Sequence, residues 1–191
     1  MNSKYIDNKV FEQIDIRIKG MDVGEYDTCR FINCDFSEYD LSGFSFTDCE
    51  FSGCNLSLVK LNGTSIRDVK FIGCKMLGLH FDQCNDFGLS FSIKSCSMDH
   101  SVFYKKKIKQ TIFTNSRLKE VDFSECDLSG STFDNCDLLG SVFDNTNIEK
   151  VDFRSSYNYS IDPEINKMKR AKFSLQGVKG LLNKYNIEIG D

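Results

Sequence analysis

The stretch VDFSECDLSGSTFDNCDLLGSVFDNTNIEKVDF, residues 121–153, decides how the 191-residue chain folds. A large apolar side chain stands at every fifth position of this stretch: Phe123, Leu128, Phe133, Leu138, Phe143, Ile148 and Phe153. An amphipathic helix repeats every 3.6 residues and a strand every two, so neither explains the spacing. The spacing instead predicts a coil whose five-residue sides each point one large side chain into a common interior.

The same period extends over most of the chain in two phases. Counting in fives from Ile6 to Phe91, and again from Ile93 to Phe153, gives 31 positions, of which 30 are large and apolar. Small residues stand two positions before most of them, and all nine cysteines belong to this second set. Seven glycines stand two positions after a central residue, where a corner is expected to need positive φ.

Phenylalanine also recurs at intervals of twenty residues, as in the series from Phe11 to Phe91. Four five-residue sides make one square turn, so identical residues stack in successive turns about 4.8 Å apart. Thirty-one sides make nearly eight turns, a rod about 37 Å long at that spacing. We expect the interior to be formed mainly by Phe31, Phe51, Phe71, Phe103, Phe113, Phe123, Phe133, Phe143 and Phe153.

The segments 39–43 (YDLSG) and 126–130 (CDLSG) resemble the repeating unit of the pentapeptide-repeat family. The resemblance covers residues 6–153 and implies an all-β fold, a right-handed quadrilateral parallel β-helix. We therefore assign residues 1–153 to this solenoid, with a possible division into two subdomains near the change of phase. Residues 154–191 are assigned to a C-terminal cap and dimerisation module that includes a short helix.

The two phases differ by two residues, and the break falls near 84–92, in the segment CNDFGLSF. Asp86 would point inward if the first phase continued, and an unpaired charge is costly to bury. One interpretation is a bulge that lets Phe87 or Leu89 replace Asp86. The other is a bend that divides the rod into two subdomains.

Lys106 poses a second problem, because its inward position should not bury an unpaired charge. It belongs to the segment YKKKIK, residues 104–109, which preserves the phase of the repeat. The four lysines of this segment form either a solvated face or a contact patch.

The repeat fades after Phe153, and a tail with a different pattern follows. Ser174 is expected to cap a helix that runs to about Lys184, and Ile187 and Ile189 alternate as a short strand. The helix carries one apolar stripe, made of Leu175, Val178, Leu181, Leu182 and Tyr185. The stripe and the two isoleucines predict a cap over the end of the solenoid, an isologous dimer interface, or both.

The segment FSLQGVK, residues 173–179, with the leucine-rich segment and Ile-x-Ile that follow, resembles the C-terminal module of Qnr-type quinolone-resistance pentapeptide proteins. In that group the module dimerises the rod, and the acidic dimer mimics B-form DNA toward DNA gyrase or topoisomerase IV. No insertion interrupts the repeat between Ile6 and Phe81, so this chain resembles the loop-free members. The resemblance does not imply a loop-dependent activity.

The net charge of −4 is unevenly distributed, with +3 in residues 154–191 and −7 in residues 1–153. An acidic body argues against direct nucleic-acid binding, which requires basic surface. No apolar run approaches the roughly 18 residues of a membrane span. The first residues, MNSKYIDNKVF, lack the apolar region of a secretory signal, so we expect a cytoplasmic protein with reduced cysteines.

The sequence offers no residues arranged for catalysis. The cysteines hold inward positions without a CxxC pair, and His80 and His100 stand at outward positions. A convex rod also lacks the enclosed pocket of an enzyme, so we predict no enzyme, no cofactor and no metal site. Two functions remain: a binding protein that mimics DNA toward gyrase or topoisomerase IV, and a pentapeptide-repeat scaffold or interaction module with another partner.

Overall fold

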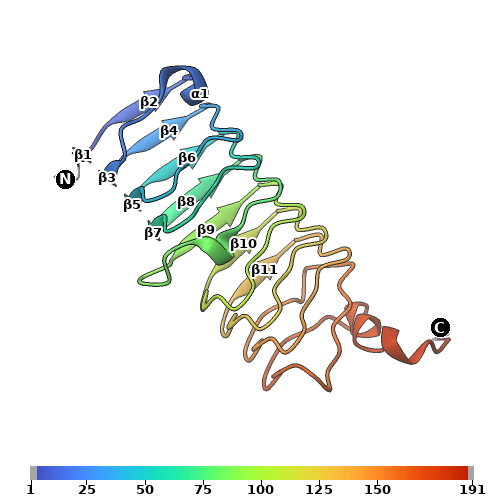
Figure 1. Cartoon of the computed structure of the whole chain (residues 1–191). Helices are drawn as coiled ribbons and strands as arrows, with labels where there is room; N and C mark the ends of the chain where they lie inside the picture. The colour runs from blue at the N-terminus through green and yellow to red at the C-terminus, as the bar shows by residue number, and fades with distance from the viewer. Residues whose placement is uncertain (1–3, 189–191) are drawn as a thin grey trace.

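The computed structural model describes residues 4–188, and it shows a straight rod of stacked coils with the N- and C-termini at opposite ends (Figure 1). Every strand pairing is parallel, and the pairs join residues that are twenty apart along most of the chain. The all-β solenoid expected from the repeat is confirmed. Each coil has four sides, which we call faces A, B, C and D in chain order.

Two of the faces carry the regular strands. Face A carries β1 (Lys4–Asp7), β3 (Gly24–Asp27), β5 (Ser45–Thr47) and β7 (Ser65–Arg67). Face B carries β2 (Val10–Glu12), β4 (Arg30–Ile32), β6 (Glu50–Ser52), β8 (Val69–Ile72), β9 (Phe91–Lys94), β10 (Ile112–Thr114) and β11 (Thr132–Asp134). On faces C and D, successive coils are joined by single bridges, such as Asp35 to Asn55 on face C and Asp40 to Lys60 on face D.

Three short elements and one helical turn complete the described chain. These are α1 (Ile16–Lys19), η1 (Phe81–Gln83), η2 (Gly177–Leu181) and η3 (Asn183–Tyr185). Helix α1 is a single turn in the first coil, where the side chain of Asp15 accepts a hydrogen bond from the Arg17 amide. The period-five pattern gave no sign of this turn, because Ile16 still points inward. No helix within residues 4–188 is long and apolar enough to cross a membrane.

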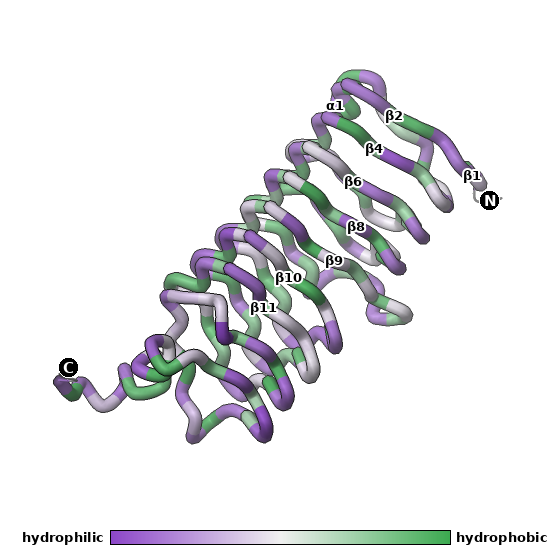
Figure 2. The backbone as a smooth tube through the Cα atoms, turned by 180° about the vertical axis from the view of Figure 1, so that it is seen from behind, coloured by the Kyte–Doolittle hydropathy of each residue, from purple (hydrophilic) through white to green (hydrophobic). Residues whose placement is uncertain are grey.

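The interior is a column of stacked phenylalanine rings. The nine phenylalanines proposed for it are all buried, with at most 5% of any one exposed. Phe113 and Phe133 stack at 4.6 Å between ring centroids, and Phe133 and Phe153 stack at 5.0 Å. Rings on the opposite faces B and D meet edge to face across the interior, as Phe123 does with Phe133. Apolar and polar residues accordingly alternate along each coil (Figure 2).

The corners explain the glycines of the repeat. All seven glycines that stand two positions after a central residue have positive φ, for example Gly43 at 76° and Gly130 at 74°. Asparagine and aspartate take the same corner in other coils, as at Asn33 and Asp48, both with φ of 51°. These residue types tolerate the left-handed region better than most.

One coil has 22 residues instead of twenty. Val69 pairs with Phe91 and Phe71 with Ile93, so β8 and β9 meet directly and the stack continues across the change of phase. This register corrects the expectation that Phe91 continues the column of Phe71. Phe91 takes the position two residues before Ile93, and it meets Phe71 edge to face at 6.5 Å.

Candidate protein-interaction surfaces

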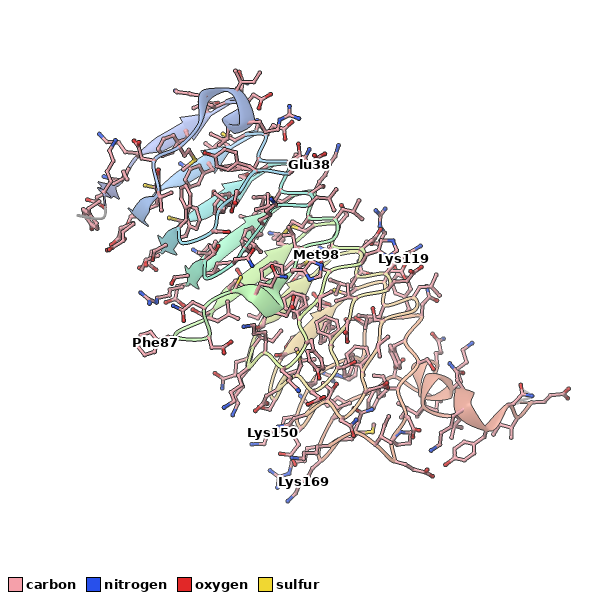
Figure 3. The ribbon with its side chains drawn as sticks, viewed as in Figure 1. Glu38, Phe87, Met98, Lys119, Lys150 and Lys169 are labelled. Carbon is pink, nitrogen blue, oxygen red and sulfur yellow. The ribbon has the colours of Figure 1, made fainter. Side chains whose placement is uncertain are left out.

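The two extra residues form a loop, residues 85–90, that projects from face A in the middle of the rod (Figure 3). Leu89 points inward and is 9% exposed, whereas Phe87 is 76% exposed. Of the two residues considered for the inward position, Leu89 therefore takes it. Sequence reasoning missed the exposed ring of Phe87. The signal was the two-residue excess, which forces part of this segment out of the coil.

The loop is tied to its neighbours by several hydrogen bonds. The Asn85 side chain accepts from the amide of Phe87 at 3.0 Å. The Arg67 guanidinium lies 5.3 Å from the centroid of the Phe87 ring, within cation–π range. The Asp68 amide donates to the Ser90 hydroxyl at 2.8 Å. Phe87 is thus presented on an ordered projection, which lowers the entropy lost when a partner covers the ring.

Lys106 fastens the same loop from inside the rod. Its ammonium donates to the Cys84 carbonyl oxygen at 2.8 Å and to Asp86 Oδ1 at 2.5 Å. Only 6% of the Lys106 side chain is exposed, against 83% of the Asp86 side chain. The buried charge is therefore paired, and Asp86 points outward to reach it. Lys106 therefore ties the loop to the next coil. It belongs neither to a solvated face nor to a contact patch, the two roles considered for its segment.

The C-terminal tail caps the last coil around Tyr159. An added Cβ at Gly177 or Gly180 would lie within 2.9 Å of the Tyr159 side chain, so both glycines are needed for this approach. The Ile161 amide donates to the Gly180 carbonyl oxygen at 3.0 Å. Lys184 pairs with Asp162 at 2.7 Å beside this contact. The tail is thereby held against the last coil of its own chain.

The helix predicted from Ser174 to about Lys184 is wrong in type. The tail forms two short 3-10 turns, η2 and η3, although the Ser174 hydroxyl does accept from the Gly177 amide at 3.0 Å. Two glycines lower the helix propensity, and so short a helix is marginal on its own. Ile187 is not in a strand, and Ile189 lies outside the described residues.

Several apolar side chains of the tail face solvent. Leu175 is 91% exposed, Val178 41%, Tyr185 49% and Ile187 56%. Leu181 and Leu182 are half-buried, and Leu181 packs against the core. Of the six proposed dimer residues within residues 4–188, Leu181 packs against the core, Leu182 is half-buried and the other four face solvent.

The charges of faces C and D are predominantly negative. Their outward positions carry twelve carboxylates: Asp15, Asp22, Asp35, Glu38, Asp40, Asp82, Asp99, Glu120, Asp122, Glu125, Asp137 and Asp144. They carry six strongly basic side chains: Arg17, Lys60, Lys75, Lys105, Arg117 and Lys119. Some of these are paired, as Arg117 is with Asp99 at 2.7 Å. Faces C and D together form the acidic side of the rod, although between Asp40 and Asp82 their outward positions carry Lys60 and Lys75 and no carboxylate.

The cysteines serve packing. All nine are buried, and several donate to carbonyl oxygens of neighbouring coils, as Cys54 does to Phe31 at 3.3 Å. Burial raises the pKa of the Cys49, Cys84 and Cys126 thiols to about 12. Among residues 4–188 no group of His, Cys, Asp or Glu side chains is arranged to hold a metal ion.

Comparisons with known proteins define the family. The family model for the pentapeptide repeat region matches residues 25–92 and 90–160, so the chain belongs to the pentapeptide-repeat family. Among solved structures, it is similar to trypsin-treated QnrB1, a plasmid-mediated fluoroquinolone resistance protein, over 98% of both chains, with 17% identity and a TM-score of 0.63.

It is also similar to HetL, a pentapeptide repeat protein involved in heterocyst differentiation regulation in the cyanobacterium Nostoc. That similarity covers 90% of this chain and 88% of HetL, with 12% identity and a TM-score of 0.61. No curated protein sequence matches this chain. At these identities the structural comparisons establish the fold and leave the partner open.

Proposed function

We propose that this protein is a non-enzymatic binding protein that engages a type II topoisomerase, DNA gyrase or topoisomerase IV, as a mimic of duplex DNA. The observation that carries the proposal is the acidic side formed by faces C and D on a rod of the QnrB1 fold. QnrB1 is itself a fluoroquinolone resistance protein. A rod of stacked coils offers a long, straight surface to a groove that normally holds DNA.

The magnitude of the charge limits how strongly such a mimic can bind. Faces C and D carry twelve carboxylates and six strongly basic side chains, whereas duplex DNA over about 37 Å carries about 22 negative charges at one per 1.7 Å. The protein is therefore a weak electrostatic mimic.

We further propose that the tail pairs two rods end to end. The four open apolar side chains of the tail support an isologous contact between two copies. Leu175→Asp tests this contact best, because Leu175 is 91% exposed and its loss leaves the cap intact. Light scattering in 500 mM NaCl, where contacts between surface charges are screened, should show a halved mass for the variant relative to the parent. A parent mass near 21.8 kDa would contradict the proposal.

A supercoiling assay tests the topoisomerase proposal. The protein should change the supercoiling activity of gyrase, or restore that activity in the presence of a quinolone. Replacing acidic residues of face D by lysine should abolish this effect. The test variant is Asp40→Lys with Asp144→Lys, and the matched control is Glu12→Lys with Asp134→Lys on face B. No effect of the parent protein with or without quinolone would discard the proposal, as would equal loss in both variants.

The alternative is a scaffold with another partner. The similarity to HetL favours it, since HetL has a similar fold and is involved in regulating heterocyst differentiation. A scaffold would leave supercoiling unchanged while the folded rod still captures a protein through Phe87 or the tail. Phe87→Ala should then reduce capture without altering the fold.

A further inference from the structure

Face A differs from the other faces because its charges are separated along the rod. It has nine levels, and the loop 85–90 occupies the fifth. Outward positions of the first four levels carry five carboxylates and one arginine: Asp7, Glu25, Asp27, Asp48, Asp68 and Arg67. Those of the last four carry six bases and two acids: Lys107, Lys109, Lys150, Lys167, Lys169, Arg170, Asp127 and Glu149.

Most of these charges lack partners within the chain. Among residues 4–188, none of the five carboxylates forms an ion pair, although Asp27 and Asp68 accept hydrogen bonds from hydroxyl groups. Nor do Lys150, Lys169 and Arg170 pair with any carboxylate there. On face C, by contrast, Arg117 and Lys119 are both paired.

Three cationic side chains, those of Lys150, Lys169 and Arg170, share one corner of the rod with a single carboxylate, Glu149. Lys150 and Arg170 take the same corner position in adjacent coils, with φ of 60° and 62°. The Lys150 amide donates to the Lys169 carbonyl oxygen at 3.0 Å, which brings the two levels together. Adjacent coils are about 4.8 Å apart, so like charges at the same position of two adjacent coils repel one another. An acidic surface placed against this corner would relieve that repulsion.

The loop lies at the centre of this arrangement. Four levels precede it and four follow it, with a net charge of −4 before and +4 after at outward positions. Lys4, which is exposed at level one, is paired with Asp22 outside this face. Phe87 projects from the centre, on the same side of the rod as Lys150 and Lys169 (Figure 3). The two halves of the face therefore carry opposite net charge, and the complementarity is strongest between level one and level nine.

We propose that face A binds face A of a second copy, with the two rods antiparallel and a twofold axis beside Phe87. Level one of each rod then lies opposite level nine of the other, so Asp7 faces Lys169 and Arg170. Level two lies opposite level eight, so Glu25 and Asp27 face Glu149 and Lys150. The two Phe87 rings meet at the axis, where each covers apolar surface of the other.

Other arrangements of two rods satisfy fewer charges. A parallel pair would set acid against acid and base against base along the whole face. A partner of a single charge sign would suit one half of the face and repel the other half. The antiparallel pair is also separate from the end-to-end tail contact, so it can be measured in the Leu175→Asp variant.

A cysteine at the axis tests the pairing directly. All nine native cysteines are buried, so Phe87→Cys supplies the accessible thiol. Copper phenanthroline with dissolved oxygen would oxidise two such thiols to one disulfide, releasing two protons and two electrons to the oxidant. We expect a covalent dimer in 50 mM NaCl, formed about tenfold more slowly in 500 mM NaCl. The control is Leu77→Cys on face C. Leu77 is 41% exposed, and a cysteine at this position should cross-link slowly at both salt concentrations.

Charge reversal gives the decisive arm of the experiment. In the Phe87→Cys background, one variant carries Asp7→Lys, Glu25→Lys and Asp48→Lys, and the other carries Lys150→Glu, Lys169→Glu and Arg170→Glu. Each variant alone should cross-link about tenfold more slowly than the parent, and their mixture should recover the parent rate. Salt-independent cross-linking, or a mixture as slow as its components, would overturn the proposal.

Discussion

The seventh level of the rod keeps the five-residue period, whereas the fifth level interrupts it. The two levels differ in their core and in their surface. Around Phe133 every side has five residues, and the ring stacks at 4.6 Å and 5.0 Å on its neighbours above and below. In the coil that contains Leu89 two residues are added, so a phenylalanine faces solvent and a lysine is buried. A regular period thus builds the core, and a change in the period creates surface features that the regular coils lack.

The largest effect is expected where the period is intact. Phe133→Ala removes a fully buried ring from the column and should lower the free energy of unfolding by about 3–5 kcal/mol. Ile112→Ala is the control, because Ile112 is 53% exposed and should change stability by less than about 0.5 kcal/mol. Urea denaturation measures both, and equal values for the two would show that the column does not carry the stability.

A smaller effect is expected from the buried lysine. Lys106→Met removes the donor to the Cys84 carbonyl oxygen and should cost about 1–3 kcal/mol, since a buried acceptor is left without a partner. Asp86 limits the loss, because its side chain is 83% exposed and stays hydrated. The matched control is Lys107→Met, an exposed neighbour that should be neutral. Limited proteolysis should cut the 85–90 loop faster only in the Lys106 variant.

The smallest effect is a dependence of stability on pH. Hydrogen bonding to Arg154 lowers the pKa of Asp152 to about 2. Because the folded pKa is below the unfolded value of about 3.9, the stabilisation is present above pH 4 and is lost as the pH falls toward 2. Asp152→Asn should flatten this part of the stability curve and leave the curve shape above pH 5 unchanged. An identical acid limb in both proteins would exclude Asp152 as a contributor.

The sequence predicted the regular coils because a large apolar side chain, which must be buried, recurs at every fifth position. It also predicted a two-residue excess near Leu89, but it left Phe87 and Leu89 as alternatives. The choice depends on local hydrogen bonds of Asn85 and on the cation–π contact of Arg67 with Phe87, which periodicity does not encode. The expectation that Phe91 stacks on Phe71 failed for another reason, since the two extra residues shift the register and pair Phe71 with Ile93.

The tail shows a different limit of sequence reasoning. Its apolar stripe predicted a helix, but Gly177 and Gly180 approach Tyr159 so closely that tight 3-10 turns form. The stripe therefore identified the apolar residues without identifying which ones support the cap. Likewise, composition gave an acidic body, while the separation of charge along face A depends on which corners the coil brings together.

A pair of deletions tests the central claim that a five-residue period builds one continuous interior. The first variant deletes Phe87 and Gly88 and carries Asp86→Leu and Lys106→Cys, which restores a twenty-residue coil. The second deletes Ser129 and Gly130 from a regular coil. The free energy of unfolding in urea should be retained or raised in the first variant and largely lost in the second. Equal loss in both variants would contradict the account.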